Sequence, residues 1–149
     1  SYKDGLMKTL KQLIENNPRK LASVTPDQTV YRALEMMAEH DVGALLVLEG
    51  RYLRGVFSER DYARKVFLRG KSSEHTKVSE VMSGRVAYVT LDQTVEECLA
   101  IMTEKHFRHL PVLSDSHNVV GMISIGDLIK EMISQQQFII KQLEHYITS

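Results

Sequence analysis

The chain has 149 residues, enough for one ordinary domain or for two small halves that share a core. Lysine and arginine together number 19, as do aspartate and glutamate, so the net charge is zero before histidine is counted. This balance argues against broad electrostatic capture of nucleic acid or of an anionic membrane, and no apolar run is long enough to span a bilayer. The single cysteine, Cys98, excludes an internal disulfide and a multi-cysteine zinc site.

The first predicted element is an amphipathic helix within residues 1–19. The Asn16-Asn17-Pro18 sequence ends this helix. Its apolar residues recur at helical spacing: Leu6, Met7, Leu10, Leu13 and Ile14. Because this stripe has no obvious place in a core built from the rest of the chain, we interpret it as a surface for a second copy or for another partner.

Residues 20–70 predict a unit of strand, helix, strand, strand and helix. A short extended segment comes first, and Asp27-Gln28-Thr29 then offers a helix start. Two strands rich in branched residues follow over residues 43–48 and 52–57, separated by a turn that contains glycine. Ser58 then begins the second helix of the unit.

Residues 71–77 form a polar linker, and residues 78–132 repeat the whole unit. Val24–Val30 recurs as Val89–Val95 with a single difference, and a longer alignment around these segments keeps nearly half of its residues identical. An α/β unit of about 60 residues is too small to be comfortably stable alone. We therefore expect the two copies to pack together and to bury one another's sheets.

Residues 133–149 extend the last helix of the second unit beyond the repeat. The Gln135-Gln136-Gln137 sequence interrupts its apolar stripe, which otherwise keeps a helical spacing. The stripe consists of Leu128, Ile129, Met132, Ile133, Ile139, Ile140, Leu143 and Ile147. As at the N-terminus, we interpret this stripe as a dimer surface or a partner surface.

Each unit contains the pattern G-x-x-S-x-x-D before its last helix, as Gly55–Asp61 and Gly121–Asp127. With this order, spacing and duplication, residues 20–132 resemble the CBS-domain pair, also called a Bateman module. Arg108–Val112 is typical of its second copy, and Val56–Lys65 is similar to the stand-alone CBS-pair proteins of bacteria and organelles. The resemblance implies an α/β (α+β) fold in which two CBS repeats form a pseudo-two-fold pair. It also implies that AMP, ATP, NAD or S-adenosylmethionine binds in clefts between the repeats, and that two chains form a flat, disc-shaped homodimer.

A bound nucleotide needs a place for its phosphate, a grip on its ribose and a slot for its base. Ser58 and Ser124 stand at helix starts, where free backbone N–H groups and a hydroxyl favour phosphate. Asp61 and Asp127 follow in the first turn, and each carboxylate can accept hydrogen bonds from the two hydroxyls of a ribose. The same spacing is also a helix-capping box, and the two roles are compatible. The matching glycines let a backbone or a ligand come close, which favours a ligand role.

The remaining candidate residues come mainly from the second repeat. A phosphate held by Ser124 is expected to meet Arg60 or, less readily, Lys77 from the other side, or Arg108 itself. Arg60 has a simpler interpretation as part of a solvated helix face. His109 is also a candidate, although a histidine at a strand start is more often packed or hydrogen-bonded than bound to a ligand. The slot for the base is expected from Val86, Tyr88, Leu110, Pro111 and Ile123.

Together these patterns predict a non-enzymatic regulatory module that senses energy or redox state by binding AMP, or the related ATP or NAD, without a metal. The sequence has no nucleophile elbow, no P-loop, no dinucleotide-binding fingerprint and no third ligand at metal spacing. The expected partners are an adenine nucleotide, a second copy and a regulated protein, but neither nucleic acid nor a membrane. The alternative is a protein-interaction scaffold with vestigial clefts, which the C-terminal stripe favours.

The expected compartment is the cytoplasm, because a single cysteine agrees with a reducing environment. The chain begins at Ser1 rather than at a methionine. An organelle is therefore the alternative, if a targeting segment has been removed.

Overall fold

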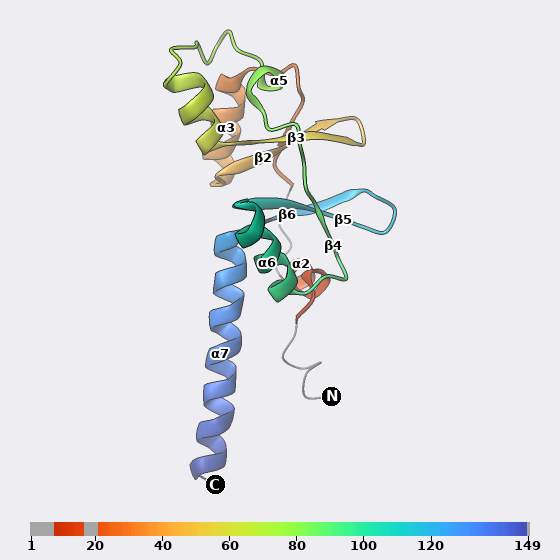
Figure 1. The fold of residues 1–149 in the computed structure, drawn as a ribbon, viewed down its shortest axis with the longest axis vertical. Coiled ribbons are helices and arrows are strands. Elements are labelled where there is room, and N and C mark those ends of the chain that lie inside the picture. The colour runs from red at the N-terminus through yellow and green to blue at the C-terminus, as the bar shows by residue number, and fades with distance from the viewer. Residues whose placement is uncertain (1–7, 17–20, 149) are drawn as a thin grey trace.

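The computed structural model describes residues 8–16 and 21–148. Leu6, Met7 and the Asn17-Pro18 end of the predicted N-terminal helix lie outside the described residues. The described chain forms two α/β units stacked along the long axis of the molecule, and a long C-terminal helix projects from the second unit (Figure 1).

The two units repeat one topology, which confirms the predicted duplication. The first contains β1 (Ser23–Val24), α3 (Val30–His40), β2 (Ala44–Glu49), β3 (Tyr52–Ser58), α4 (Glu59–Asp61) and the π-helix η1 (Tyr62–Phe67). The second contains β4 (Val89–Thr90), α6 (Val95–Lys105), β5 (His109–Leu113), β6 (Val119–Ser124) and α7 (Ile125–Thr148). Each sheet has three strands, the first pair parallel and the second antiparallel. Both sheets also carry an irregularity at the matching place in the antiparallel pair.

The long helices α3 and α6 begin and end where the sequence provides caps. The hydroxyls of Thr29 and Thr94 accept hydrogen bonds from the backbone N–H three residues further on, which satisfies a donor that the helix itself leaves unpaired. Asp41 and His106 follow the last helical residues with φ of 51° and 60°, the left-handed conformation that ends many helices. Both helices therefore have locally encoded boundaries.

The central strand of each sheet is buried on both faces. Leu45 and Val47 of β2 pack into the core of the first unit. Ala44 and Leu46 alternate with them, so they point to the opposite face, yet they are also buried. This second face lies toward the sheet of the other unit, which is stacked below it in Figure 1. Two separate cores and one shared interface between sheets thus hold the pair together.

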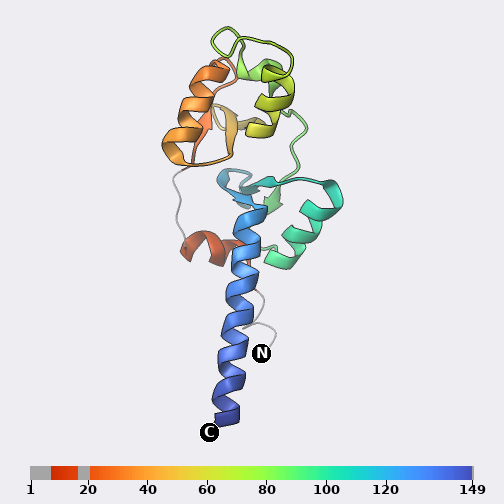
Figure 2. The same ribbon diagram turned by 90° about the vertical axis from the view of Figure 1, so that its left-hand side faces the viewer.

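The helix that precedes each repeat packs into the other repeat. α2 (Leu10–Asn16) comes before the first unit in the sequence, yet Leu10 and Leu13 are buried in the core of the second. α5 (Val78–Val81) comes before the second unit and completes the core of the first (Figures 1 and 2). Our interpretation of the N-terminal stripe as an outer surface is therefore wrong for Leu10 and Leu13.

Matching backbone hydrogen bonds fix the two exchanged helices. The N–H of Leu10 donates to the carbonyl of Gln93 at 2.9 Å, and the N–H of Val78 donates to the carbonyl of Gln28 at 2.9 Å. A second pair of bonds repeats the match one residue further along each helix. The structural repeat therefore begins with a leading helix, and the leading helix of each copy packs into the core of the other copy.

The glycine of each G-x-x-S-x-x-D pattern makes room for the exchanged segment. A Cβ atom on Gly55 would lie 2.7 Å from the backbone oxygen of Ser83 and 2.9 Å from Sδ of Met82, just after α5. A Cβ atom on Gly121 would lie 3.2 Å from Cδ1 of Ile14 on α2. Close packing of the chain accounts for both glycines, so they give no separate support for a ligand.

The Gly55→Ala change should destabilise the fold by about 1–3 kcal/mol, because the new methyl group meets a backbone oxygen that cannot rotate away. The matched control is Gly121→Ala, where only the flexible end of Ile14 is in the way. We expect its free energy of unfolding to change by less than about 1 kcal/mol. Urea unfolding followed by circular dichroism measures both, and equal costs would contradict this role for Gly55.

α7 is one continuous helix that passes through the Gln135-Gln136-Gln137 sequence without a break. Its first turns contact α6 and β6, and the rest extends away from both units (Figure 2). Across the described residues, no helix is long and apolar enough to cross a membrane.

Candidate functional site

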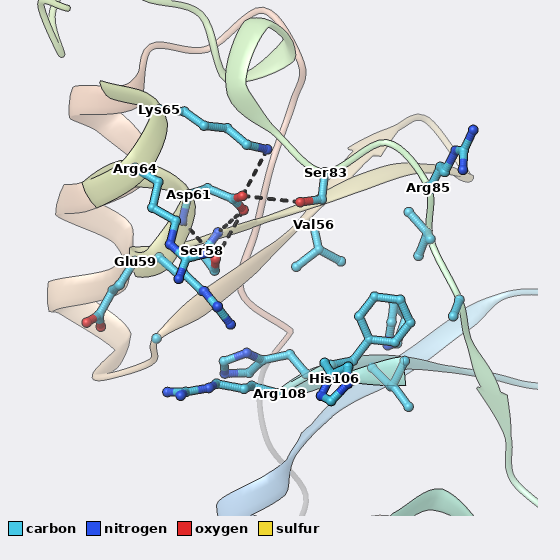
Figure 3. A pocket seen from close by; sticks show the side chains of 18 residues that line it. Val56, Ser58, Glu59, Asp61, Arg64, Lys65, Ser83, Arg85, His106 and Arg108 are labelled. Carbon is cyan, nitrogen blue, oxygen red and sulfur yellow. Dashed lines mark hydrogen bonds and ion pairs between the residues drawn. The ribbon is translucent and has the colours of Figure 1, made fainter. Parts of the chain in front are cut away.

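A cleft of about 480 Å³ lies between the two repeats, within the usual size of small-ligand sites. The first repeat contributes residues from the start of α4 and from η1, the second contributes the beginning of β5, and the connection between the repeats forms the third side (Figure 3). The lining residues are Gly43, Val56, Ser58, Glu59, Arg60, Asp61, Arg64, Lys65, Ser83, Arg85, Val86, Ala87, His106, Phe107, Arg108, His109, Leu110 and Pro111.

Ser58 and Asp61 form a complete capping box at the start of α4, as one of the two predicted roles requires. Asp61 Oδ2 accepts hydrogen bonds from the backbone N–H and from the hydroxyl of Ser58, both at 3.0 Å. Ser58 Oγ accepts the backbone N–H of Asp61 at 3.2 Å. In the second repeat, Ser124 and Asp127 make the same reciprocal backbone contacts at 3.0 and 3.1 Å. Capping is therefore a role of both motifs.

The second carboxylate oxygen of Asp61 ties this helix start to the inter-repeat connection. Asp61 Oδ1 accepts a hydrogen bond from the hydroxyl of Ser83 at 3.2 Å and lies 3.1 Å from the ammonium of Lys65 (Figure 3). Lys65 also donates to the carbonyl of Val81 at 3.2 Å. The Asp61 carboxylate is mostly buried, so its charge is balanced by Lys65 rather than by water.

Four arginine side chains line the same cleft, although that of Arg85 points away from it (Figure 3). Arg60 and Arg64 come from the helices that follow Ser58, Arg85 from the connection, and Arg108 from the opposite repeat. Within residues 8–16 and 21–148, none of these guanidinium groups forms an ion pair. Because like charges gathered in a concave site attract anions, the cleft is suited to phosphate.

His109 lies at the start of β5, beside Arg108. Burial lowers the pKa of His109, and the charge of Arg108 acts in the same direction, whereas Asp127 and Glu59 oppose the shift. The imidazole is therefore neutral near pH 7 in the free protein. A neutral imidazole can offer a hydrogen bond to a ligand without the full cost of burying a charge.

The structure brings together eight of the residues that the sequence predicts for the site. They are Ser58, Arg60, Asp61, Val86, Arg108, His109, Leu110 and Pro111. The others do not line this cleft: Lys77, Tyr88, Ile123, Ser124 and Asp127. The combination thus differs from the one that the sequence favoured, because Arg60 and Arg108 line a cleft with Ser58, and Ser124 is not among its lining residues.

The positions that match three of the basic lining residues are uncharged in the other repeat. In the repeat alignment, Arg108 and His109 correspond to Gly43 and Ala44, and Arg60 corresponds to Gly126. The two repeats are therefore alike in their caps and unlike in their charges.

Several lining residues were missed at the sequence level. Arg64 and Lys65 are not among the residues that the sequence analysis selects for the site, although the position of Lys65 one turn after Asp61 is a usable signal. For Ser83 and Arg85 no local signal exists, since both reach the cleft only because the connection packs against Gly55.

Two further kinds of site can be checked in the described residues, a metal cluster and a reactive thiol. Over the described ranges, no group of three or more histidine, cysteine or acidic side chains could hold a metal ion. Cys98 is fully buried on α6, and burial raises the pKa of its thiol to about 11, so it is a packed core residue.

The family model described as "CBS domain" matches this chain twice, over residues 11–67 and 78–134. The chain belongs to the CBS-domain family. Each matched range begins in one of the exchanged helices, the first in α2 and the second at the start of α5. The duplicated CBS unit therefore includes the leading helix that each copy places in the other.

Known CBS-domain proteins resemble the chain over most of its length. The mitochondrial protein CBSX3 of Arabidopsis thaliana is 38% identical over 128 residues, which are 83% of this chain but only 62% of CBSX3. A solved CBS-domain protein from Burkholderia ambifaria is 46% identical with a TM-score of 0.82, over 87% of this chain and 96% of that one. The cytosolic domain of the Mg²⁺ channel MgtE, solved in complex with ATP, is 25% identical with a TM-score of 0.61, over 74% of this chain and 44% of that one.

Proposed function

We propose that this CBS pair is a non-catalytic regulatory module that binds an adenine nucleotide, AMP or the related ATP or NAD, in the cleft between its repeats. The observation that carries the proposal is that Asp61, a carboxylate that accepts hydrogen bonds from hydroxyls, lies in one cleft with Arg60, Arg64 and Arg108, which form no ion pair among the described residues. The ATP complex of the related MgtE domain supports the same class of ligand.

In the proposed complex, the two ribose hydroxyls donate to the Asp61 carboxylate. Asp61 Oδ2 keeps its hydrogen bonds from Ser58, because these also cap the helix. At Oδ1 the ribose replaces the contacts from Ser83 and Lys65. Since the bond from Ser83 ties the connection between the repeats to Asp61, its loss on occupancy of the cleft would loosen this connection, which gives the ligand a means of regulation.

The phosphate would lie between the walls of the cleft, and the base against its apolar side. Arg108 reaches the phosphate from the second repeat, and Arg60 and Arg64 reach the phosphate from the first. Guanidinium groups suit this role because their paired donors match two phosphate oxygens. Val86 and Pro111 offer apolar surface for the adenine.

Thermal unfolding of protein stripped of co-purified ligand tests the proposal. The panel comprises AMP, ADP, ATP, NAD, NADH, S-adenosylmethionine and adenosine. A ligand at 100 times its dissociation constant stabilises a fold by about 2.7 kcal/mol, a shift of several degrees at this size. We expect such a shift for at least one phosphorylated compound and a weaker one for adenosine. A flat panel at millimolar concentrations would refute nucleotide binding.

Binding should strengthen as the pH falls, because a phosphate near His109 favours its protonated form. In the free protein the pKa of His109 is lowered, so the fold loses stability as the pH falls through that pKa. A bound anion raises the pKa again, and each binding event then takes up a proton. Titration calorimetry at pH of about 7.5 and about 6 should show tighter AMP binding at the lower pH.

The His109→Gln variant separates this effect from the titration of the phosphate itself. Glu59, Asp127 and Arg108, the charged groups that act on His109, are unchanged in the variant. We expect a smaller gain in affinity on acidification than in the wild type. The same gain in affinity in both proteins would show that His109 does not act on the bound phosphate.

We propose further that the module works as a homodimer in the cytoplasm and acts on a regulated protein partner. Exposed apolar side chains remain available on both repeats: Tyr31, Phe67, Leu68, Ile129 and Ile133. The alternative is an interaction scaffold with unused clefts. The exposed face of α7 favours this scaffold function. We would prefer the scaffold function if no compound of the nucleotide panel raised the unfolding temperature.

A further inference from the structure

We propose that Glu59 makes the cleft prefer a nucleoside monophosphate over a triphosphate. Its carboxylate closes the phosphate end of the cleft and repels each phosphate beyond the first. The inference rests on the proposed nucleotide function, and it specifies which member of that ligand class the cleft selects.

The Glu59 carboxylate lies where the walls of the two repeats approach one another. The backbone N–H of Glu59 donates to the carbonyl of Gly43 at 3.0 Å. A Cβ atom on Gly43 would lie 3.4 Å from Oε1 of Glu59 and 3.8 Å from Nε2 of His109, which belongs to the other repeat. Burial lowers the pKa of His109, and the charges of Asp127 and Glu59 oppose that shift. The charge of Glu59 therefore acts across the cleft.

The groups that line the cleft follow one another in the order of the parts of a nucleotide (Figure 3). Val56 lies toward one end, the Asp61 carboxylate comes next, and the side chains of Arg64 and Glu59 follow toward the other end. Arg108 lies on the facing wall, at the same end as Glu59. With the base against the apolar side and the ribose on Asp61, a chain of phosphates runs past the arginines toward the Glu59 carboxylate.

The fold itself does not require an acid at this position. The matching residue of the second repeat is Ile125, whose backbone N–H donates to the carbonyl of Arg108 at 2.9 Å, just as that of Glu59 donates to Gly43. An acid in the first turn of a helix is mildly stabilising, yet α7 begins without one at this place. Among the described residues, the Glu59 side chain neither accepts a hydrogen bond nor forms an ion pair. A structural role therefore does not account for its carboxylate.

The balance of charge in the cleft suits a single phosphate. A terminal phosphate carries up to about two negative charges, which the guanidinium groups of Arg60, Arg64 and Arg108 can match. The further charges of a di- or triphosphate would lie nearer to Glu59, and like charges brought together lower affinity for the wrong ligand. We therefore expect affinity to fall in the order AMP, ADP, ATP.

Titration calorimetry of the full chain with AMP and with ATP tests this selectivity, at low ionic strength and without divalent metal. The wild type should bind AMP more tightly than ATP. Glu59→Gln should reduce the preference for AMP about fivefold, through tighter binding of ATP. The matched control is Glu96→Gln, which also removes an exposed acid from the first turn of a helix but lies outside the cleft. Its preference should equal that of the wild type.

A second variant, Glu59→Lys, should shift the ratio of the two affinities further in the same direction, because its charge attracts the outer phosphates. The same ratio in the wild type and in Glu59→Gln would overturn the role of Glu59 and leave nucleotide binding intact. Equal weakening of both nucleotides in Glu59→Gln would also overturn it, since a helix-starting role alone has that effect. If neither nucleotide bound to any of these proteins, the nucleotide function itself would be refuted, and the selectivity with it.

Discussion

Replacing Asp61 with alanine should abolish most of the stabilisation that AMP gives. The ribose would lose two hydrogen bonds to a charged carboxylate, together worth about 3 kcal/mol, which lowers affinity by about 100-fold. AMP at 100 times the wild-type dissociation constant stabilises the wild type by about 2.7 kcal/mol and would stabilise the variant by only about 0.4 kcal/mol. Thermal unfolding with and without AMP measures the difference.

Asp127→Ala is the matched control for this experiment. Both substitutions remove a helix cap worth about 1 kcal/mol of intrinsic stability, and Asp61→Ala also loses the contacts with Ser83 and Lys65. They differ in their surroundings, because the arginine-lined cleft contains Asp61 and not Asp127. We therefore expect AMP to stabilise Asp127→Ala as much as the wild type. Retained stabilisation in Asp61→Ala, with loss in Asp127→Ala, would move the site to the second repeat.

The Leu10→Ala change should lower the free energy of unfolding by about 2–5 kcal/mol, although Leu10 precedes the first repeat. Its side chain is fully buried in the core of the second repeat, and truncation would leave a cavity there. Lys11→Ala is the control on the same helix, because Lys11 is exposed. Urea unfolding followed by circular dichroism measures both variants.

A cost for Leu10→Ala below about 1 kcal/mol would show that α2 is not part of the second core. The result bears on function as well. Ile14 of α2 lies against Gly121 in β6, and β6 pairs with β5, which begins with His109 on the wall of the cleft. Loss of α2 should therefore weaken nucleotide binding in addition to stability.

The elements of the fold were predictable because their signals are local. Thr29 and Thr94 cap their helices as the sequence indicated, since a cap depends only on residues within one turn. The strands and the duplication followed from apolar runs and from repeated residues. The π-helix after Asp61 was not predicted, since its wider turns depend on packing and not on a local sequence signal.

The exchange of leading helices could not be derived from the sequence. The spacing of Leu10 and Leu13 shows that one face of α2 must be covered, but not which core covers it. Only the three-dimensional arrangement shows that α2 belongs with the second repeat and α5 with the first.

Individual residues of the candidate site could be selected from the sequence, but which of them lie together in one cleft could not. Ser58, Asp61 and Arg108 each carried a chemical reason for selection in the sequence. Arg108 lines the same cleft as Ser58 because of the way the two repeats stack, and this stacking leaves no trace in the sequence of either repeat alone. The charge difference between the repeats, visible at Gly43 and Arg108, is the signal that the two repeats are not equivalent.

A crystal structure of the chain grown with AMP tests the central claim most directly. We predict one AMP in the cleft between the repeats, with its ribose hydroxyls on the Asp61 carboxylate in place of Lys65 and Ser83, and with its phosphate against Arg108. AMP bound beside Ser124 and Asp127, or a cleft that stays empty at saturating AMP with Lys65 still on Asp61, would contradict the claim.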